Sequence, residues 1–503
     1  MITVNIKRYN PETNKQYMES YEIEHTDKMK VLDALQQIND KYDAKIAYRY
    51  SCRAGQCGSC AIKINGQAKL ACKAEINDND TLEPLDFKVI KDLIVDRSPL
   101  NKKVNDLNLY MASESDEKLL EPEIIKPEII KPETYAQTEA LRGCIDCYSC
   151  ISMCPVIKKS TEFIGPYFMR AFSDLSFDPR EDTSKSEDAI DSGLYSCTSC
   201  GECSKTCPKE IDIYGKGIEK LRATAFARKE GPLEAHKQIR ESVINTGRTV
   251  QPMDDSKYPE GFIKAYNQTH TFEEKPKIAF FTGCMIDNRL PWIAEYLINI
   301  LSKLGYEVDI PEQQVCCGSP LFRTGQVDVI PSLIKKNYET FKDYDIVLTV
   351  CAGCGSTLKN NYPEYDAKLN VMDITEFLQD KLKTEDMNKL DLKVTYHDPC
   401  HLVRGQGISK QPRKILNNIN GVEFIEMEKP DQCCGAGGGV KSGKPELAKS
   451  LADSKVDMID ELDVDYVVTI CPFCEFNIQD SLTNKNSKTE VINLMELLNK
   501  AYE

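Results

Sequence analysis

DIVLTVCAGC (345–354) and DYVVTICPFC (465–474) decide the fold of the second half of this chain. Each is a short apolar, β-branched run that ends on a cysteine, and a second cysteine follows three positions later. An unbroken apolar run of this length is typical of a parallel strand that is covered on both faces of its sheet. The two stretches therefore predict two buried strands, each presenting a pair of cysteines at its carboxyl end.

Two further stretches extend this similarity into an internal repeat. KIAFFTGC (277–284) corresponds to KVTYHDPC (393–400), and a Cys-Cys-Gly sequence lies between the matching strands in both copies, at Cys316–Gly318 and Cys433–Gly435. In open α/β sheets, ligands gather at the carboxyl ends of the strands. We therefore predict two small α/β lobes, each bringing five cysteines to one sheet edge. The predicted lobes span residues 276–388 and 389–503.

A helical pattern separates the first two strands of the repeat. In PWIAEYLINILSKLG (291–305), Pro291 suits the first turn of a helix and Gly305 suits its end. Trp292, the single tryptophan of the chain, lies on this amphipathic stretch. We expect its side chain to belong to the core.

All 22 cysteines of the chain sort into five groups. In a long chain whose first residues do not resemble a signal peptide, so many cysteines indicate metal or redox chemistry rather than disulfides. Three groups of four lie in the first half: Cys52, Cys57, Cys60 and Cys72; Cys144, Cys147, Cys150 and Cys154; Cys197, Cys200, Cys203 and Cys207. Two groups of five lie in the repeat: Cys284, Cys316, Cys317, Cys351 and Cys354; Cys400, Cys433, Cys434, Cys471 and Cys474.

Charge and hydropathy argue against two classes of partner. The net charge of -15 argues against nucleic acid, although a local group of cations could still bind a small anion. No apolar run reaches the roughly 18 residues that a membrane-spanning helix needs. MITVNIKRYN (1–10) alternates polar and apolar residues instead of forming a signal peptide. We therefore predict a cytoplasmic protein without a membrane span.

The first cysteine group has the spacing of a plant-type [2Fe–2S] site. SCRAGQCGSC (51–60) supplies Cys-x4-Cys-x2-Cys, and Cys72 follows at a distance. Gly55 and Gly58 allow the loop to curl so that its amide groups point at the sulfurs, which stabilises a negative cluster. Zinc is the alternative metal for this group.

The second and third groups share one pattern, Cys-x2-Cys-x2-Cys-x3-Cys-Pro, in CIDCYSCISMCP (144–155) and CTSCGECSKTCP (197–208). This is the signature of a two-[4Fe–4S] ferredoxin, in which the last cysteine of each run ligates the other cluster. The residues between the two motifs suggest helices. One cubane is then predicted to take Cys144, Cys147, Cys150 and Cys207, and the other Cys197, Cys200, Cys203 and Cys154.

The remaining patterns of the first half suggest its domains. Residues 1–9 alternate as a half-buried strand, and residues 30–38 place their apolar side chains on one helical face. In EPEIIKPEIIKPE (121–133) a proline recurs every five positions, so the segment is either a semi-rigid linker or disordered. The predicted domains are 1–100 for the [2Fe–2S] motif, 101–134 for the connecting segment with its Pro-rich linker, and 135–250 for the two [4Fe–4S] motifs.

SCRAGQCGSCAIKINGQAKLAC (51–72), VIKDLIVD (89–96) and the two Cys-Pro motifs resemble the iron–sulfur subunit of succinate dehydrogenase and fumarate reductase, over residues 1–245. The resemblance implies a β-grasp [2Fe–2S] domain, an α-helical domain with two clusters, and a partner flavoprotein that handles succinate and fumarate. Many members of that family lack the second cysteine of the last motif and hold a [3Fe–4S] cluster beside a quinone. Because Cys200 is present here, we predict a full cubane and do not expect the usual quinone site.

The second half, residues 276–503, resembles the tandem CCG domains of heterodisulfide reductase. The resemblance implies one noncubane [4Fe–4S] cluster per lobe, held by five thiolates, with a substrate disulfide between the two clusters. It makes the ten cysteines of the lobes the catalytic residues. Five cysteines exceed what a four-iron cubane requires, and this excess is visible in the sequence itself.

Both halves in one chain, in this order, resemble the family of iron–sulfur subunits of methanogen thiol:fumarate reductases. The resemblance implies an oxidoreductase subunit that oxidises coenzyme M and coenzyme B to their heterodisulfide. Two electrons would pass along one-electron clusters to the flavoprotein, which reduces fumarate to succinate. The implied cofactors are one [2Fe–2S], two cubane [4Fe–4S] and two noncubane [4Fe–4S] clusters, with FAD in the partner subunit only. The multidomain chain would combine α+β and α/β folds.

Two alternatives remain open at this stage. The first is an electron-transfer subunit of a quinone-linked succinate or glycerol-3-phosphate dehydrogenase, some of which use CCG domains. A module without disulfide chemistry need not keep ten cysteines in two complete repeats. The second is a heterodisulfide reductase subunit without fumarate chemistry, and the N-terminal [2Fe–2S] domain argues against it.

Residues beside the lobe cysteines are candidate contacts. HDPCH (397–401) places His397 and His401 around Cys400, as hydrogen-bond donors or as proton acceptors for substrate thiols. A loop-holding hydrogen bond is the alternative role. The glycines at 435 and 437–439 are expected to let the backbone approach a cluster, rather than to cradle phosphate. The candidate cations for the sulfonate of coenzyme M and the phosphate of coenzyme B, each otherwise a surface charge, are Arg289, Arg323, Arg404 and Lys441.

Overall fold

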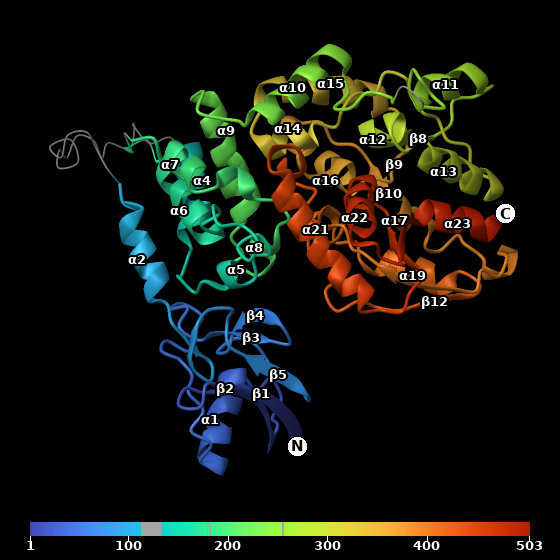
Figure 1. The fold of residues 1–503 in the computed structure, drawn as a ribbon. Coiled ribbons are helices and arrows are strands. Elements are labelled where there is room, and N and C mark those ends of the chain that lie inside the picture. The colour runs from blue at the N-terminus through green and yellow to red at the C-terminus, as the bar shows by residue number, and fades with distance from the viewer. Residues whose placement is uncertain (112–131, 179, 182, 254–255) are drawn as a thin grey trace. The chain divides into compact units, whose positions relative to one another are not determined.

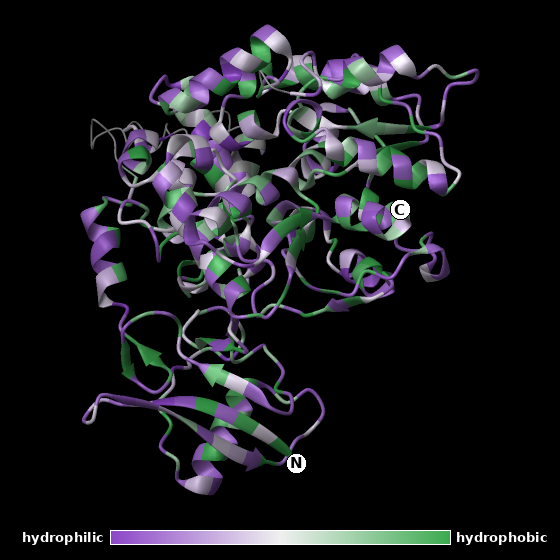
Figure 2. Cartoon of the chain, turned by 45° about the vertical axis from the view of Figure 1, so that its right-hand side comes forward, coloured by the Kyte–Doolittle hydropathy of each residue, from purple (hydrophilic) through white to green (hydrophobic). Residues whose placement is uncertain are grey.

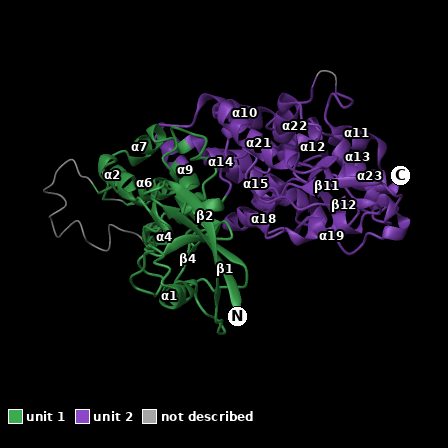
Figure 3. Ribbon diagram, turned by 60° about the horizontal axis from the view of Figure 1, so that its bottom comes forward, with its two compact units in different colours: residues 1–194, 201–221 green, residues 195–200, 222–503 purple. Residues whose placement is uncertain are grey.

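The computed structural model describes residues 1–111, 132–178, 180–181, 183–253 and 256–503. These residues form two compact units (Figures 1 and 3). Unit 1 contains residues 1–194 and 201–221, and unit 2 contains residues 195–200 and 222–503. No helix among the described residues combines the length and the apolar character that crossing a bilayer demands.

Unit 1 begins with a mixed sheet in the strand order β2-β1-β5-β3-β4, with β1 antiparallel to β2 and parallel to β5. The alternation predicted for residues 1–9 is confirmed, because Val4 and Ile6 are fully buried. The predicted helix is α1, and its Leu35 and Ile38 belong to the same core. The elements are β1 (Ile2–Asn10), β2 (Lys15–Ile23), α1 (Val31–Tyr42), β3 (Ala61–Ile64), β4 (Gln67–Leu70), β5 (Asp80–Glu83), β6 (Val89–Lys91), β7 (Ile94–Val95) and α2 (Ser98–Asp106).

The second part of unit 1 is helical, as the spacing of the two Cys-Pro motifs predicted. Most of the predicted linker lies outside the described residues. Its last part was predicted wrongly, since Pro132 begins a helix, where its missing N–H and fixed φ are tolerated. The elements are α4 (Pro132–Arg142), α5 (Ser149–Ser152), α6 (Pro166–Phe177), α7 (Lys185–Asp191), α8 (Glu202–Lys205), a π-helical segment (Ile213–Glu219) and α9 (Lys220–Ala227), which continues into unit 2.

Unit 2 contains two wholly parallel sheets, one per lobe, in the orders β10-β9-β8 and β12-β11-β13-β14. Its strands are largely hydrophobic along their length, and its helices show mixed faces (Figure 2). Ahead of the lobes lie α10 (Glu234–Thr246) and α11 (Phe262–Thr269). Lobe 1 has β8 (Ile278–Phe281), α12 (Gly283–Asn288), α13 (Trp292–Lys303), α14 (Ser319–Thr324), α15 (Ile330–Phe341), β9 (Ile346–Thr349), α16 (Ala352–Asn360), β10 (Val371–Asp373) and α17 (Ile374–Leu378). Lobe 2 has β11 (Leu392–Tyr396), α18 (Cys400–Gln406), α19 (Lys410–Asn418), β12 (Val422–Phe424), α20 (Val440–Gly443), α21 (Pro445–Asp460), β13 (Tyr466–Thr469), α22 (Pro472–Lys485), β14 (Glu490–Asn493) and α23 (Leu494–Tyr502).

The sequence repeat is a repeat of topology. In lobe 2 the amide of Ile425 donates to the carbonyl of Val394 at 2.8 Å, beside β12. In lobe 1 the amide of Asp309 donates to the carbonyl of Ile278 at 2.9 Å, so a single bridge takes the place of the edge strand. The strand order is therefore the same in both lobes, with the edge strand of lobe 1 reduced to one residue pair.

The predicted helix at 291–305 is α13, and its Leu297 and Leu301 are fully buried. The prediction for Trp292 was wrong: its side chain is 36% exposed. Trp292 is the first residue of the helix, and the face that enters the core begins with the next residue, Ile293.

The two lobes pack against each other in a two-fold manner. Helix α16 of lobe 1 contacts α18 of lobe 2, and the equivalent pair, α12 and α22, also contacts. The same exchange relates α13 with α23 and α17 with α19. Each contact thus occurs twice with the roles of the lobes reversed, which is the property of an isologous interface. The edge of each sheet that carries the cysteines consequently faces its counterpart.

Candidate functional site

A cavity of about 360 Å³ lies within unit 2 where the two lobes meet. All ten cysteines of the lobes line it, so the structure brings both predicted groups of five together. Arg323, Lys441, His401 and Phe473 also contribute to its wall. All ten are free thiols, not disulfides.

The strands bring four cysteines to the cavity through the starts of helices. Cys351 and Cys471 cap the N-termini of α16 and α22, and Cys400 is the first residue of α18. Cys284 lies at the start of α12. The strands end between two and four residues before these cysteines, so the expectation that strands end directly on them was slightly wrong. At a helix start the backbone N–H groups favour a thiolate over a thiol.

The two CCG turns have one conformation. Gly318 and Gly435 have φ of 88° and 90°, a left-handed region that a side chain would strain. The turn directs backbone amides at sulfur: the amide of Gly318 donates to Sγ of Cys316 at 3.4 Å, and that of Gly435 to Sγ of Cys433 at 3.3 Å. A Cβ on Gly435 would lie 2.5 Å from a carbonyl of α21. Each turn therefore needs glycine.

The five thiols of lobe 1 lie close enough to shift one another's pKa, and this series of neighbours continues into lobe 2. The link between the lobes is Cys351 with Cys471, which occupy equivalent positions. Hydrogen bonds from Cys351 and Cys474 lower the pKa of Cys471 well below its ordinary value. In order, the neighbouring pairs are Cys284–Cys316, Cys316–Cys317, Cys317–Cys354, Cys354–Cys351, Cys351–Cys471, Cys471–Cys474 and Cys474–Cys434.

A cysteine from the third cysteine group, the second Cys-Pro motif (197–208, called the third motif below), packs against cysteines of lobe 2. Cys200, which belongs to unit 2, packs with Cys400 and Cys433 in a small buried cluster. The thiol of Cys200 also shifts the pKa of Cys433. The second cysteine of the third motif therefore contacts the CCG turn of lobe 2 directly.

Three side chains hold the backbone around Cys200. Arg404 donates from Nε to the carbonyl of Cys200 at 2.6 Å and forms an ion pair with Asp431 at 2.9 Å. Nε2 of His401 lies 3.1 Å from the carbonyl of Ser199. The fully buried guanidinium of Arg222 donates to the carbonyls of Cys197 and Gly438, at 2.8 and 3.1 Å. Sequence reasoning missed Arg222, because it lies outside every cysteine motif.

The glycine run after Cys434 also serves this contact. A Cβ on Gly438 would lie 2.3 Å from the carbonyl of Cys197, and one on Gly437 would lie 2.7 Å from that of Thr198. The sequence predicted that these glycines let the backbone approach a cluster; in the structure Gly437 and Gly438 lie against the backbone of the third cysteine group. On Gly439 the obstacle would be His236, a buried histidine whose Nε2 lies 3.0 Å from the Gly439 carbonyl. No role had been assigned to His236 from the sequence.

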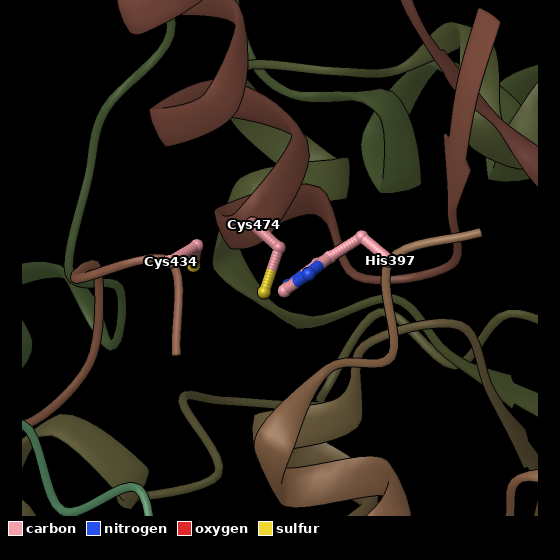
Figure 4. Close-up of side chains that lie close together, drawn as sticks. All are labelled: His397, Cys434 and Cys474. Atoms are coloured by element: carbon pink, nitrogen blue, oxygen red, sulfur yellow. The ribbon is translucent and has the colours of Figure 1, made fainter. Parts of the chain in front are cut away.

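His397 lies with Cys434 and Cys474, and the nearest ligand atoms of all three lie within 4.8 Å of one another (Figure 4). The imidazole comes from the loop after β11 and points toward the sulfur of Cys474, which comes from α22. His397 is only 1% exposed. Neither ring nitrogen of His397 has a hydrogen-bond partner among the described residues. The thiol of Cys474 is the largest influence that lowers the pKa of Cys434 well below its ordinary value, and the neighbouring His397 lowers it further. His397 is therefore a direct neighbour of two lobe cysteines.

The four candidate cations separate into two pairs. Arg323 and Lys441 line the cavity, and Lys441 also pairs with Asp480. Arg289 and Arg404 do not line it, and Arg404 instead holds Cys200 as described above. His401 does line the cavity; desolvation and then the charge of Arg323 lower the pKa of His401 to about 3.

In unit 1 the first cysteine group surrounds a curled loop. The amides of Ala54 and Gln56 donate to Sγ of Cys52 at 3.4 and 3.3 Å. Backbone hydrogen bonds around Cys52 and Ser59 lower the pKa of Cys57 to about 6. The thiols of Cys60 and Cys72 are hydrogen bonded to each other. These N–H···S contacts are the kind that stabilise a bound iron–sulfur cluster.

A second cavity, which lies in unit 1, is lined by cysteines of both Cys-Pro motifs. Its wall includes Tyr167 and Arg170 as well. Of the other predicted cubane set, Cys154 and Cys203 belong to unit 1, and Cys197 and Cys200 to unit 2. The cysteines that line the second cavity are Cys144, Cys147, Cys150 and Cys207.

The [2Fe–2S] loop lies directly against the first Cys-Pro motif. A Cβ on Gly58, which has φ of 65°, would lie 2.3 Å from the carbonyl of Ile145 and 3.0 Å from Cβ of Cys147. Arg97 donates to the carbonyl of Gly58 at 3.4 Å and its guanidinium lies over the ring of Tyr148. Only glycine permits this approach between the two cysteine loops.

Comparison with known proteins agrees with these sites. Family models match residues 3–102 as a 2Fe-2S iron-sulfur cluster binding domain and residues 140–211 as a 4Fe-4S dicluster domain. The cysteine-rich CCG model matches twice, at 278–359 and 394–479. The predicted combination of domains is confirmed, and the soft thiol donors fit iron–sulfur clusters.

Two relatives and one solved structure are informative. The chain is 32% identical to a subunit of the dihydromethanophenazine:CoB--CoM heterodisulfide reductase of Methanosarcina acetivorans, over 73% of this chain and 95% of that protein. A crystal structure of a hypothetical protein from Helicobacter pylori matches with a TM-score of 0.63 at 13% identity, over 100% of this chain and 94% of that one, and shows the fold alone. A fumarate reductase (CoM/CoB) subunit of Methanothermobacter marburgensis is 51% identical over 100% of this chain and 99% of its own length. The resemblance drawn from the cysteine motifs is thereby confirmed, and this chain is an oxidoreductase subunit that belongs to the same fumarate reductase (CoM/CoB) family.

Proposed function

We propose that this chain oxidises the thiols of coenzyme M and coenzyme B to their heterodisulfide in the cavity of unit 2, and passes the electrons to a flavoprotein subunit that reduces fumarate. The two thiols lose two protons and two electrons as the S–S bond forms. Fumarate takes up two electrons and two protons to become succinate. The observation that carries the proposal is the meeting of ten cysteines from two lobes at one cavity, with Cys351 touching Cys471.

We assign one noncubane [4Fe–4S] cluster to each group of five cysteines, which when bound would accept the electrons of the thiols. Five buried thiols per lobe and the amides that donate to Cys316 and Cys433 support this assignment. The contact of Cys200 with Cys433 supports an exit for electrons from lobe 2 toward the cubane pair. Within unit 1, the approach of Gly58 to Cys147 supports transfer between the first cubane and the [2Fe–2S] cluster.

The chain's own residues have distinct tasks in this proposal. Arg323 and Lys441 supply positive charge at the cavity wall for the sulfonate and phosphate of the two coenzymes. Phe473 gives the wall an apolar surface that excludes water. His401 holds the Ser199 carbonyl and so fixes Cys200 relative to lobe 2.

The test is anaerobic turnover by the full chain in complex with its flavoprotein. Cys433→Ser and Cys434→Ser should each abolish oxidation of coenzyme M plus coenzyme B, while dye-linked fumarate reduction by the flavoprotein survives. Thiol oxidation that persists in both variants contradicts the proposal. Turnover that is blocked by a quinone analogue would instead favour an electron-transfer subunit of a quinone-linked dehydrogenase.

A further inference from the structure

The two lobes differ at one buried position of the helix that follows the CCG turn. Asn337 of α15 corresponds, 118 residues along the chain, to Lys455 of α21. Both side chains are 0% exposed. A neutral amide in lobe 1 is thus replaced by an amine in lobe 2. With the same shift, the buried residues Ile330, Leu333, Ile334 and Phe341 correspond to Ala448, Leu451, Ala452 and Ile459.

Asn337 supports the CCG turn of lobe 1 without adding charge. Its Nδ2 donates to the carbonyls of Val315 and Cys316 at 3.2 and 3.1 Å, and its Oδ1 accepts from the amide of Val315 at 2.9 Å. Nδ2 also donates to the hydroxyl of Tyr362 at 2.8 Å. Every hydrogen bond that the structure describes for this side chain is therefore between neutral groups.

Lys455 holds the segment that precedes the CCG turn of lobe 2, at Lys429 and Pro430, with an amine. Its Nζ donates to the carbonyls of Lys429 and Pro430 at 2.6 and 3.1 Å and lies 3.3 Å from the sulfur of Met427. Helix α21 passes directly beneath the turn, because a Cβ on Gly435 would meet Leu451 at 2.9 Å. None of the bonds that the structure describes for Nζ is to a carboxylate, so the ammonium charge is not neutralised by a direct ion pair.

The other charges near Lys455 do not neutralise it, so lobe 2 keeps a buried positive charge that lobe 1 lacks at the equivalent position. The carboxylates near Lys455 already have cationic partners: Asp431 pairs with Arg404 at 2.9 Å, and Asp398 with Arg413 at 2.8 Å. Burial lowers the pKa of Lys455 to about 8, and the charge of Cys434 raises it. In a medium of low dielectric constant, such a charge acts strongly on its neighbours.

The cations of lobe 1 do not reverse the difference. Arg248 lies near Cys284 but is paired with Asp287 at 2.9 Å. Arg323 lines the cavity that both lobes share, and its charge acts on His401 of lobe 2. In addition, His397 of lobe 2 stands where lobe 1 has the apolar Phe281.

We propose that Lys455 is a positioning residue that supports the segment leading into the CCG turn of lobe 2 and, through its buried positive charge, gives the cluster site of lobe 2 a higher reduction potential than that of lobe 1. This inference rests on the proposed function, since it requires a cluster in each lobe. A buried cation stabilises the more negative, reduced state of its neighbour. Electrons released in the cavity then collect in lobe 2, where Cys433 contacts Cys200.

The first experiment leaves Lys455 in place. Cys317→Ser and Cys434→Ser, made separately in the full chain, each leave five cysteines in one lobe only. Potentiometric titration followed by electron paramagnetic resonance should give the higher midpoint for Cys317→Ser, in which lobe 2 is complete. We expect about a tenfold larger reduced-to-oxidised ratio at equal potential, or 59 mV for a one-electron couple. Equal midpoints, or a lower one for lobe 2, overturn the inference.

The second experiment changes the charge. Lys455→Met should lower the lobe 2 midpoint by a similar amount and leave the lobe 1 midpoint unchanged, and Lys455→Arg should restore it. Lys449→Met is the matched control, because Lys449 is an exposed lysine of the same helix that pairs with Asp453. An unchanged midpoint in a correctly folded Lys455→Met chain contradicts the role.

The two experiments separate this inference from the proposed function. Iron that is present in both single-lobe variants with equal potentials removes only the role of Lys455. Iron that is absent from both lobes of the unmodified chain removes the proposed function and this inference together. If Lys455→Met fails to fold, the comparison of the two single-lobe variants still decides between the outcomes.

Discussion

The thiols of Cys351 and Cys471, equivalent residues of the two lobes, are neighbours that shift each other's pKa in opposite directions. Each caps the helix that follows the central strand of its lobe, α16 and α22. The helix contacts between the lobes are related by a local two-fold axis. Because Cys351 and Cys471 are equivalent residues and neighbours, they lie at this axis. One pair of sulfurs therefore joins two groups of five cysteines that lie about a hundred residues apart in the sequence.

This contact predicts coupling between the lobes. Cys351→Ser and Cys471→Ser should be non-additive in the free energy of unfolding, with a coupling of about 0.5–3 kcal/mol, because contacting residues do not act independently. Thermal unfolding of the metal-free chain under reducing conditions measures it. Cys284→Ser and Cys400→Ser form the control pair, since the thiol contacts of each lie on the far side of its own group. Equal coupling in both pairs would contradict the geometry.

A second prediction concerns the approach of the two cysteine loops in unit 1. Gly58→Ala should destabilise unit 1 by about 2–4 kcal/mol, because it adds a clash with Ile145 to the cost of a positive φ. Gly66→Ala is the matched control: it has φ of 75°, and no atom of the described residues lies within 4 Å of its Cβ position, so only about 1 kcal/mol is expected. Thermal unfolding and the visible absorption of the [2Fe–2S] cluster report the difference. Equal losses in the two variants would show that the loops do not meet in this way.

A third prediction addresses the buried arginine that joins the third motif to the glycine run. Arg222→Met should cost about 2–5 kcal/mol, because the carbonyls of Cys197 and Gly438 lose a charged donor. The control is Arg240→Met, an exposed pair with Asp328 whose loss should cost about 0–1 kcal/mol. Anaerobic thermal unfolding distinguishes the two. A small effect of Arg222→Met would mean that this guanidinium does not hold the segment.

A fourth prediction follows from the neighbour of Cys434 and Cys474. His397→Phe installs the residue that lobe 1 carries at this position, so iron content and folding should be retained. Loss of the polar imidazole beside Cys434 and Cys474 should reduce thiol oxidation by about 10- to 100-fold, as for other groups that support metal ligands. Activity and iron content are measured on the same preparation, with Phe281→Leu as the control in lobe 1. Full activity in His397→Phe would assign the histidine to packing alone.

A fifth prediction is a pH dependence of stability from His236. Burial lowers the pKa of His236 to about 4, from an ordinary value of about 6.5. Between these two pH values the histidine is protonated in the unfolded chain and neutral in the folded chain. Its contribution to the free energy of unfolding is therefore fully present above pH 6.5 and is lost as pH falls toward 4. Between pH 7.5 and 5.5 the loss should be about 1 kcal/mol. Urea unfolding at the two values should show this loss in the native chain and not in His236→Gln. His25→Gln, at an exposed histidine, should behave like the native chain.

The sequence by itself determined what depends on local chemistry. Cysteine spacing such as that of Cys144, Cys147 and Cys150 specifies ligand loops, because neighbouring ligands must reach one cluster over a few residues. Apolar runs such as 345–354 predicted buried parallel strands, because a strand covered on both faces needs no polar alternation. The internal repeat predicted two lobes of one topology, and the family resemblance followed from the same motifs.

Only the tertiary structure decided which distant residues meet. That Cys351 contacts Cys471, that Cys200 contacts Cys433, and that Arg222 holds both the third motif and the glycine run are outcomes of helix packing between segments far apart in the chain. The spacing of cysteines along the sequence does not predict such contacts, because they depend on how the surfaces of whole helices pack together. Lys455 shows the same limit. The sequence does not distinguish it from the other lysines on helices. Its charge can act on the cluster site only because packing buries it beneath the CCG turn, away from water.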